Sequence, residues 1–163
     1  MTDLKPLYET DTVAWSEQQA AALRAAARGG SNQPLDWENL AEEIEDLAKS
    51  LRRRLRSQIS RIIQHQVKLE YSPAVAPRNG WRRTIRHARL DIDHILQDSP
   101  SLRREVPRLI EKETSQAVQL AILDLEDHGE FGQMEMPTIR GVSYTEEQVL
   151  GDWFPKSRGA SAA

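Results

Sequence analysis

Apolar residues recur at steps of three and four along most of the chain, which is the spacing of one face of an α-helix. Residues 36–69 contain no Gly or Pro, so this stretch is predicted to be a single central helix. At about 1.5 Å per residue it would be roughly 50 Å long. Asp36 is its predicted N-cap. Its apolar positions are Trp37, Leu40, Ala41, Ile44, Leu47, Ala48, Leu51, Leu55, Ile59 and Ile62.

Shorter stretches with the same period predict further helices at 12–27, 81–97 and 102–127. Asp11 is a plausible cap for the first of them, and Pro107 is predicted either to kink the last or to lie in a first turn. A short fifth helix is expected after Thr145, where Thr-Glu-Glu-Gln fits a capping box. Residues 132–142 follow no clear period and are predicted to be irregular or a short strand pair.

These elements predict an all-α fold, a mainly antiparallel bundle of four principal helices with a long central helix and a short C-terminal helix. With 163 residues, 39% hydrophobic and 29% charged, the chain suits a single soluble domain. We expect that helical domain to cover 1–156 and a mobile tail to cover 157–163. The absence of Cys excludes disulfides and favours a cytoplasmic protein. The sequence shows no signal peptide, and no apolar run is long enough for a membrane span.

The charges of the chain are segregated. Residues 1–48 carry a net charge of −7, residues 49–90 carry +11, and residues 91–163 carry −7, which sum to −3. Helices that pack across one another can neutralise such a basic middle, and this is the favoured interpretation. The alternative is a basic face that binds an anionic partner.

Nucleic acid is the anionic partner that the basic stretch suggests most directly. Arg binds phosphate and aromatic rings stack on bases, and Trp81 lies among the arginines of 49–90. Against this, the chain has a pI of about 5.8, whereas dedicated nucleic-acid binders are basic. The arginines concerned are Arg52, Arg53, Arg54, Arg56, Arg61, Arg78, Arg82, Arg83, Arg86 and Arg89.

Polar residues interrupt the apolar side of the central helix. Advancing about 100° per residue from Leu40 places Arg54, Gln58 and His65 on that side, with Arg61 at its margin. On the predicted helix 102–127, Glu113 and Asp124 fall on the side of Leu109. Because a buried carboxylate needs a partner, Glu113 or Asp124 is predicted to contact Arg54, Arg61 or His65. This polar seam either fixes the helix register or lines a pocket near Trp81. Its residues are Arg54, Gln58, Arg61, His65, Trp81, Glu113 and Asp124.

The sequence contains no recognised catalytic motif and one spacing that could suit a metal ion. The chain has no Cys nucleophile, Gly-x-Ser-x-Gly or Walker loop, so no catalytic residue is predicted. His87, Asp91, His94 and Asp98 follow steps of four, three and four, a spacing that can chelate zinc. They lie opposite the apolar face of their helix, however, so a solvated surface is the favoured interpretation. No metal or cofactor is predicted.

Several stretches resemble a bacterial family known only as domain of unknown function 29. The stretches are Tyr8-Glu9-Thr10-Asp11 with Trp15, LDWENLAEEIE at 35–45, Trp81 with Thr84, Ile85 and Arg89, Asp98-Ser99-Pro100-Ser101-Leu102, Tyr144-Thr145, and Trp153-Phe154-Pro155. The resemblance implies an all-helical fold and a bacterial source, and it brings no activity, cofactor or catalytic residue. The Gly141-Val142-Ser143 run departs from the Cys-Pro that is typical before Tyr144.

A small helical module without a recognisable active site most often works by contact. The sequence therefore favours a non-enzymatic protein-interaction or regulatory domain that binds a protein partner. A nucleic-acid-binding accessory protein that uses the Arg-rich region 49–90 is the alternative.

Overall fold

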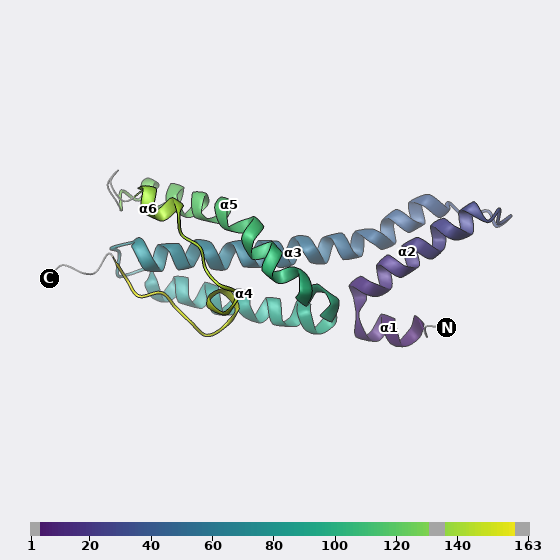
Figure 1. Cartoon of the computed structure of the whole chain (residues 1–163), viewed down its shortest axis with the longest axis horizontal. Coiled ribbons are helices and arrows are strands. Elements are labelled where there is room, and N and C mark those ends of the chain that lie inside the picture. Colours follow the sequence, from purple (N-terminus) through teal and green to yellow (C-terminus); the bar gives the residue numbers. More distant parts are fainter. Residues whose placement is uncertain (1–3, 131–135, 159–163) are drawn as a thin grey trace. The chain divides into compact units, whose positions relative to one another are not determined.

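The fold is all-α, as the computed structural model shows for residues 4–130 and 136–158 (Figure 1). Every regular element among these residues is helical, and four of the helices are long, as predicted. In chain order the elements are α1 (Leu4–Thr10), α2 (Thr12–Arg28), α3 (Trp37–Tyr71), α4 (Arg78–Asp98), the 3₁₀ helix η1 (Pro100–Glu105), α5 (Val106–Asp127), α6 (Met136–Arg140) and α7 (Glu146–Leu150).

Three local features differ from the sequence prediction. The chain is already helical before Thr12, in α1, whose Tyr8 ring packs edge-on against Trp15 at 4.8 Å. Residues 136–140 form α6 rather than an irregular stretch or a strand pair, and 132–135 lie outside the described residues. The helix predicted from 102 begins as η1, and α5 starts at Val106. Pro107 therefore lies in the first turn of α5, where no backbone donor is needed.

The described residues divide into two compact units. Residues 4–55 and 94–105 form unit 1, and residues 56–93, 106–130 and 136–158 form unit 2. The helices α3 and α4 each contribute residues to both units. The single domain over 1–156 and the mobile tail stay predictions.

Unit 1 is a helical hairpin of α2 and the first part of α3. Arg24 of α2 forms salt bridges with Glu38 and Glu45, each at 3.0 Å, and Arg52 reaches Glu17 at 2.7 Å. Earlier residues of α2 thus pair with later residues of α3, which makes the two helices antiparallel. Of these pairs, Arg52–Glu17 joins the basic middle to the acidic first part of the chain, as the favoured interpretation of the charge pattern predicts, whereas Arg24, Glu38 and Glu45 all lie within 1–48.

The predicted caps of α2 and α3 are confirmed. Asp11 accepts a hydrogen bond from Ala14 N at 2.8 Å, and its second oxygen accepts from Ser101 N at 2.7 Å. Its first oxygen also accepts from the Ser101 hydroxyl at 2.9 Å, so Asp11 joins the start of α2 to η1. Asp36 accepts from Asn39 N at 3.3 Å and remains exposed.

We therefore expect unequal losses from removing the two caps. Asp11→Ala should lower the free energy of unfolding by about 2 kcal/mol, because three donors lose a buried acceptor. Asp36→Ala should lower it by about 0.5 kcal/mol, because water can replace an exposed cap. Urea denaturation of both variants measures the difference, and Asp36→Asn serves as a nearly neutral control. Equal losses would contradict the assigned role of Asp11.

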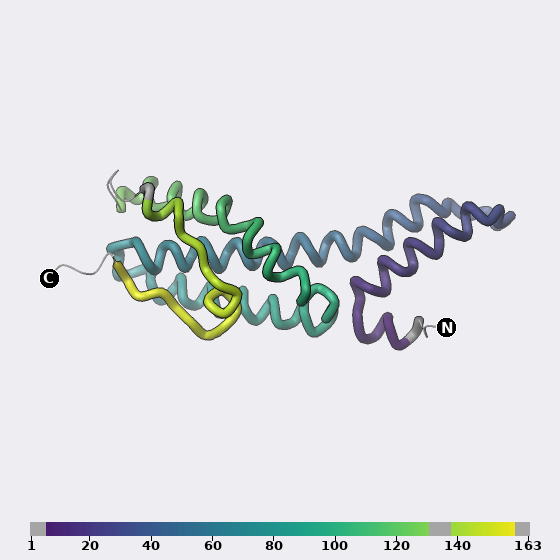
Figure 2. The backbone as a smooth tube through the Cα atoms, in the orientation of Figure 1, coloured from purple at the N-terminus to yellow at the C-terminus, as the bar shows by residue number. Residues whose placement is uncertain are grey.

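Unit 2 is built from the second part of α3, α4 and α5 (Figure 2). Gln58 of α3 donates to Asp91 of α4 at 3.0 Å, while α3 and α5 run parallel because Arg56 pairs with Glu113 and Lys68 with Asp124. The interior is aliphatic, and its fully buried side chains include Ile59, Ile62, Ile63, Leu69, Ile85, Ile92, Ile122 and Leu125.

The C-terminal segment, defined as residues 144–158, is fastened to unit 2 by polar contacts. The Tyr144 hydroxyl donates to Glu70 at 2.8 Å, and the Gln66 amide donates to the Gln148 carbonyl at 2.5 Å. Burial, and then the hydrogen bond to Glu70, raise the pKa of Tyr144, which keeps this hydroxyl a donor. The predicted capping box is confirmed, because Thr145 and Gln148 exchange both hydrogen bonds.

The buried side of α3 differs from the predicted side by about one residue. Ala41, Ala48 and Leu55 are fully buried, whereas Leu40 and Leu47 are 40% and 46% exposed. One residue corresponds to about 100° of rotation. The two candidate faces carry similar apolar content, and small alanines permit a close helix approach that larger leucines would prevent. The prediction that α3 packs through the side of Leu40 was therefore wrong for the first half of the helix, whereas Ile62 and Leu69, on the same side of the second half, are fully buried as predicted.

Candidate functional site

Because the buried side of α3 differs from the predicted one, the residues of the predicted polar seam differ in their exposure. Gln58 and Glu113 are buried, with 8% and 6% of their surface exposed. His65, Trp81 and Asp124 are half-buried, while Arg54 and Arg61 are exposed. The prediction that Arg54 faces inward was wrong, because the side of α3 it shares with Leu47 is open to solvent.

Glu113 has a different partner from those predicted. Its carboxylate accepts from Arg56 Nε at 2.6 Å, and the Arg56 side chain is 39% exposed. Arg56 was absent from the predicted seam because it lies off the side counted from Leu40. The reasoning that a carboxylate on the packed face of α5 needs a guanidinium was nevertheless sound.

Asp124 pairs with Lys68, which the sequence analysis also missed. The Lys68 ammonium lies 5.9 Å from the centre of the Trp81 ring, a cation–π distance, and its side chain is only 13% exposed. Two residues of the predicted seam, Trp81 and Asp124, are thus brought together by a third. A sequence signal existed, since Lys68 lies three residues after His65 on α3.

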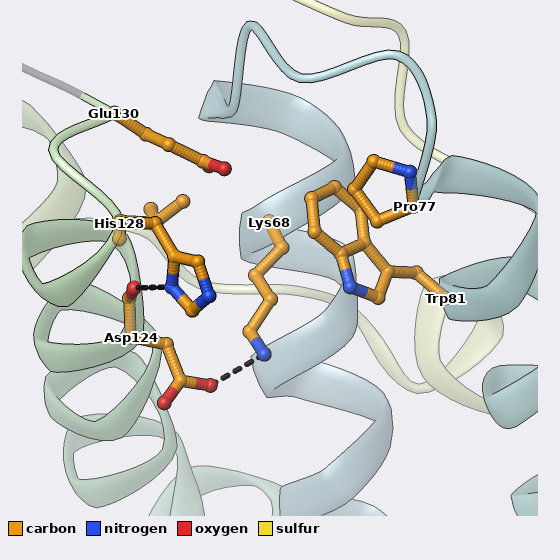
Figure 3. A pocket seen from close by; sticks show the side chains of 7 residues that line it. Lys68, Pro77, Trp81, Asp124, His128 and Glu130 are labelled. Carbon is orange, nitrogen blue, oxygen red and sulfur yellow. Dashed lines mark hydrogen bonds and ion pairs between the residues drawn. The ribbon is translucent and has the colours of Figure 1, made fainter.

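These three side chains line a pocket of about 160 Å³ between α3, the start of α4 and the end of α5 (Figure 3). His128 and Glu130 close one side of it, and Pro77 flanks the ring of Trp81 (Figure 3). The His128 ring donates from Nδ1 to the Asp124 carbonyl at 2.6 Å. Glu130 accepts from the hydroxyl of Ser72. The other lining residue is the buried Leu125.

His65 lies on α3, one turn before Lys68. Burial is the main reason that the pKa of His65 falls below its ordinary value, and the Lys68 and Arg61 charges lower it further. The hydrogen bond to the Arg61 carbonyl, 2.8 Å from Nδ1, is the second-largest effect and raises the pKa, and Asp124 raises it weakly, so burial still dominates. His65 is therefore neutral at pH 7.

The polar side chains that line the pocket have interaction partners within the protein. Lys68 has both an ion pair and an aromatic neighbour, and Glu130 and His128 each have a hydrogen-bond partner. The arrangement fastens α3 to α5 and covers Trp81, which agrees with the structural interpretation of the seam. The volume of the pocket lies below the roughly 300–1,000 Å³ that is typical of small-molecule sites.

A second polar region surrounds Phe154. Arg82, Arg86 and Arg89 of α4 lie with their guanidinium carbons 5.8, 5.4 and 5.0 Å from the centre of the Phe154 ring. Arg89 is buried and donates to the carbonyls of Val149, Gln148 and Trp153. Burial is the largest effect on the pKa of Arg89 and lowers it, although the group remains a cation.

Comparison with known families and structures identifies the family of this chain. A family model described as "Domain of unknown function DUF29" matches residues 7–154. The chain belongs to the DUF29 family. Among solved structures, it is similar to the crystal structure of an alpha-helical protein of unknown function from Rhodospirillum rubrum, with 26% identity and a TM-score of 0.67. That similarity covers 88% of this chain and 89% of the other. The comparison with curated proteins finds no match.

The residues that carry the resemblance to the DUF29 family mainly hold the fold. Asp11 and Asp36 cap helices, Arg89 fastens the C-terminal segment, and Ser99 accepts from Val13 N at 3.3 Å. Before Tyr144, where the sequence departs from the family pattern, Gly141 N and Val142 N donate to carbonyls of α6. The residues shared with the DUF29 family therefore explain the architecture, and a functional site has to be inferred from the geometry of the structure.

Metal binding by α4 finds no geometric support. Asp91 is half-buried and accepts from Gln58, so it does not share the open surface of His87, His94 and Asp98. Over the ranges that the structure describes, His, Asp and Glu side chains form no group of three that could hold a metal ion. The helices within the same ranges also lack the combined length and hydrophobicity that a membrane span requires.

Proposed function

We propose that this DUF29 protein is a non-enzymatic protein-interaction domain. Its docking surface is the α3 stripe, defined as Leu40, Ile44, Leu47 and Leu51. The observation that carries the proposal is the exposure of this stripe, because Leu40 and Leu47 are 40% and 46% exposed and the two residues between and after them are only half-buried.

The spacing of the α3 stripe suits a helical partner. Its members follow steps of four, three and four, which is the a/d pattern by which one helix packs along another. Fully burying a leucine side chain contributes about 1.5–3 kcal/mol, so covering the exposed half of each leucine would contribute about 1 kcal/mol. An amphipathic helix is the partner that fits this surface.

The polar residues of the same part of α3 support this assignment. Glu42, Asp46, Lys49 and Arg53 are exposed, and about 100° per residue places them on the side opposite the α3 stripe. Most of the charge therefore lies away from the stripe, whereas the exposed Glu43 and Arg54 lie within about 40° of Leu47.

Leu47→Glu should abolish partner binding while changing the free energy of unfolding by less than about 1 kcal/mol, because the mutated side chain is half exposed. Leu123→Glu is the matched control, since Leu123 is 45% exposed and lies in unit 2. A photo-crosslinking residue at position 47 should give one discrete adduct in native cells, and the same probe at 123 should give none. Identical adducts from both positions, or none from position 47, would reject the assignment.

Nucleic-acid binding is the second candidate. It is supported by the arginines of α4, for which the described residues supply no carboxylate salt bridge, in contrast to Arg52 and Arg56 of α3. A nucleic-acid-binding function would not require the α3 stripe. Leu47→Glu would then leave binding to DNA or RNA unchanged, and this result distinguishes the two candidate functions.

A further inference from the structure

We infer that Arg82, Arg86, Arg89 and Phe154, the α4 arginine site, bind a compact phosphate-bearing molecule. This site lies in unit 2 and is independent of the α3 stripe. The inference therefore stands or falls separately from the proposed protein-interaction function.

The start of α4 concentrates positive charge that forms no ion pair within the described residues, although Asp152 and Glu147 lie near enough to act on Arg89. The start of α4 carries five arginines and no acid between residues 78 and 90. None of the five forms a salt bridge with a carboxylate of the described residues. Arginines elsewhere in the protein behave differently, since Arg24, Arg52 and Arg56 are all paired with Glu side chains.

Three like charges lie close together on α4. Arg82, Arg86 and Arg89 follow steps of four and three, so they share one face of α4, and all three surround the Phe154 ring. Like charges at these spacings repel, and the Phe154 ring and the nearby carboxylates of Asp152 and Glu147 compensate them only in part. An anion between the guanidinium groups would remove the repulsion.

One guanidinium donor of the α4 arginine site is unused. Arg82 Nε is buried and has no hydrogen-bond partner within the described structure. Arg89, by contrast, is held rigidly by three backbone carbonyls through Nε and Nη2. A planar guanidinium matches two oxygens of a phosphate group, so a bound phosphate is the acceptor that fits both the charge and the geometry.

A pocket adjoins this site and limits what can enter it. Its volume is about 430 Å³, which is within the range of small-molecule sites, and its walls include Arg86, Arg89 and Phe154. Asp93 and Asp152 also line it. These carboxylates would repel an extended polyanion such as a nucleic-acid strand, whereas a compact ligand can place its phosphate at the arginines and its hydroxyl donors at the acids.

Isothermal titration calorimetry with pyrophosphate tests the site. R86Q and R82Q should each weaken pyrophosphate binding at least about tenfold, because each removes a charge-assisted contact. R83Q is the matched control, since Arg83 is an exposed arginine of the same helix and is not among the arginines around Phe154. R83Q should change the affinity by less than about threefold.

A single-stranded oligonucleotide, titrated in the same buffer, distinguishes the two kinds of phosphate ligand. Pyrophosphate that binds more tightly than the oligonucleotide supports the inference, and the reverse order would assign the arginines to nucleic acid. No heat with millimolar pyrophosphate, or equal losses in R83Q and R86Q, would overturn it. Circular dichroism checks the fold of each variant. If R86Q is unfolded, R86K keeps the charge without the planar fork and should still weaken binding.

Discussion

Replacing Arg89 with methionine is expected to detach the C-terminal segment from α4 and to lower the free energy of unfolding by about 3 kcal/mol. Arg89 is only 7% exposed, and its guanidinium donates to three carbonyls of residues 148–153 at 2.7–3.0 Å. Methionine fills much of the same volume but leaves those three carbonyls without a donor. Burying unsatisfied carbonyls is costly, so the segment should instead open to water.

Urea denaturation measures the stability loss, and hydrogen exchange locates it. Amide protection should fall across residues 144–158 and remain high in the buried centre of α5. Arg83→Met is the control, because it removes an exposed arginine of the same helix. A segment that stays protected in Arg89→Met would show that Tyr144 and Gln66, which also hold it, are sufficient.

The second large effect is expected for Arg56→Met, which should lower the free energy of unfolding by about 2–3 kcal/mol. The mutation leaves the Glu113 carboxylate, with 8% of its side chain exposed, without its guanidinium partner. The expected loss is at the lower end for a buried pair because the Arg56 side chain is itself 39% exposed.

The reciprocal change should cost less. Glu113→Gln removes the buried charge itself, and Arg56 can then turn toward water, so about 1 kcal/mol is expected. A double-mutant cycle with both substitutions isolates the coupling between the two side chains. A loss from Glu113→Gln that equals or exceeds the loss from Arg56→Met would show that the carboxylate makes other contacts of comparable strength.

The sequence by itself determined the helical class and most helix boundaries. Both follow from local physics, because period, caps and proline act within a few residues. Asp11, Asp36 and Thr145 accept hydrogen bonds from amides three residues ahead, so their roles can be inferred without knowing the fold. Pro107 left two alternatives, a kink or a first turn, and the structure shows it in the first turn of α5.

Tertiary structure decided which side of α3 faces the interior. The series that begins at Leu40 and the series that begins at Ala41 are both apolar, and only packing against other helices selects the alanine series. This offset of about 100° from the predicted side explains why Arg54 is exposed and why Arg56 is the partner of Glu113. It also left Leu40 and Leu47 exposed, which created the proposed docking surface.

Contacts between distant segments decided the rest of the candidate sites. Lys68, Trp81 and Asp124 meet only because three helices converge, and sequence spacing cannot show such convergence. The environment of Arg89 depends on residues 59 to 64 positions later, in and just after the short helix α7. A local pattern records what a residue does within its own helix, whereas the partner of a buried charge is set by the packing of the whole chain.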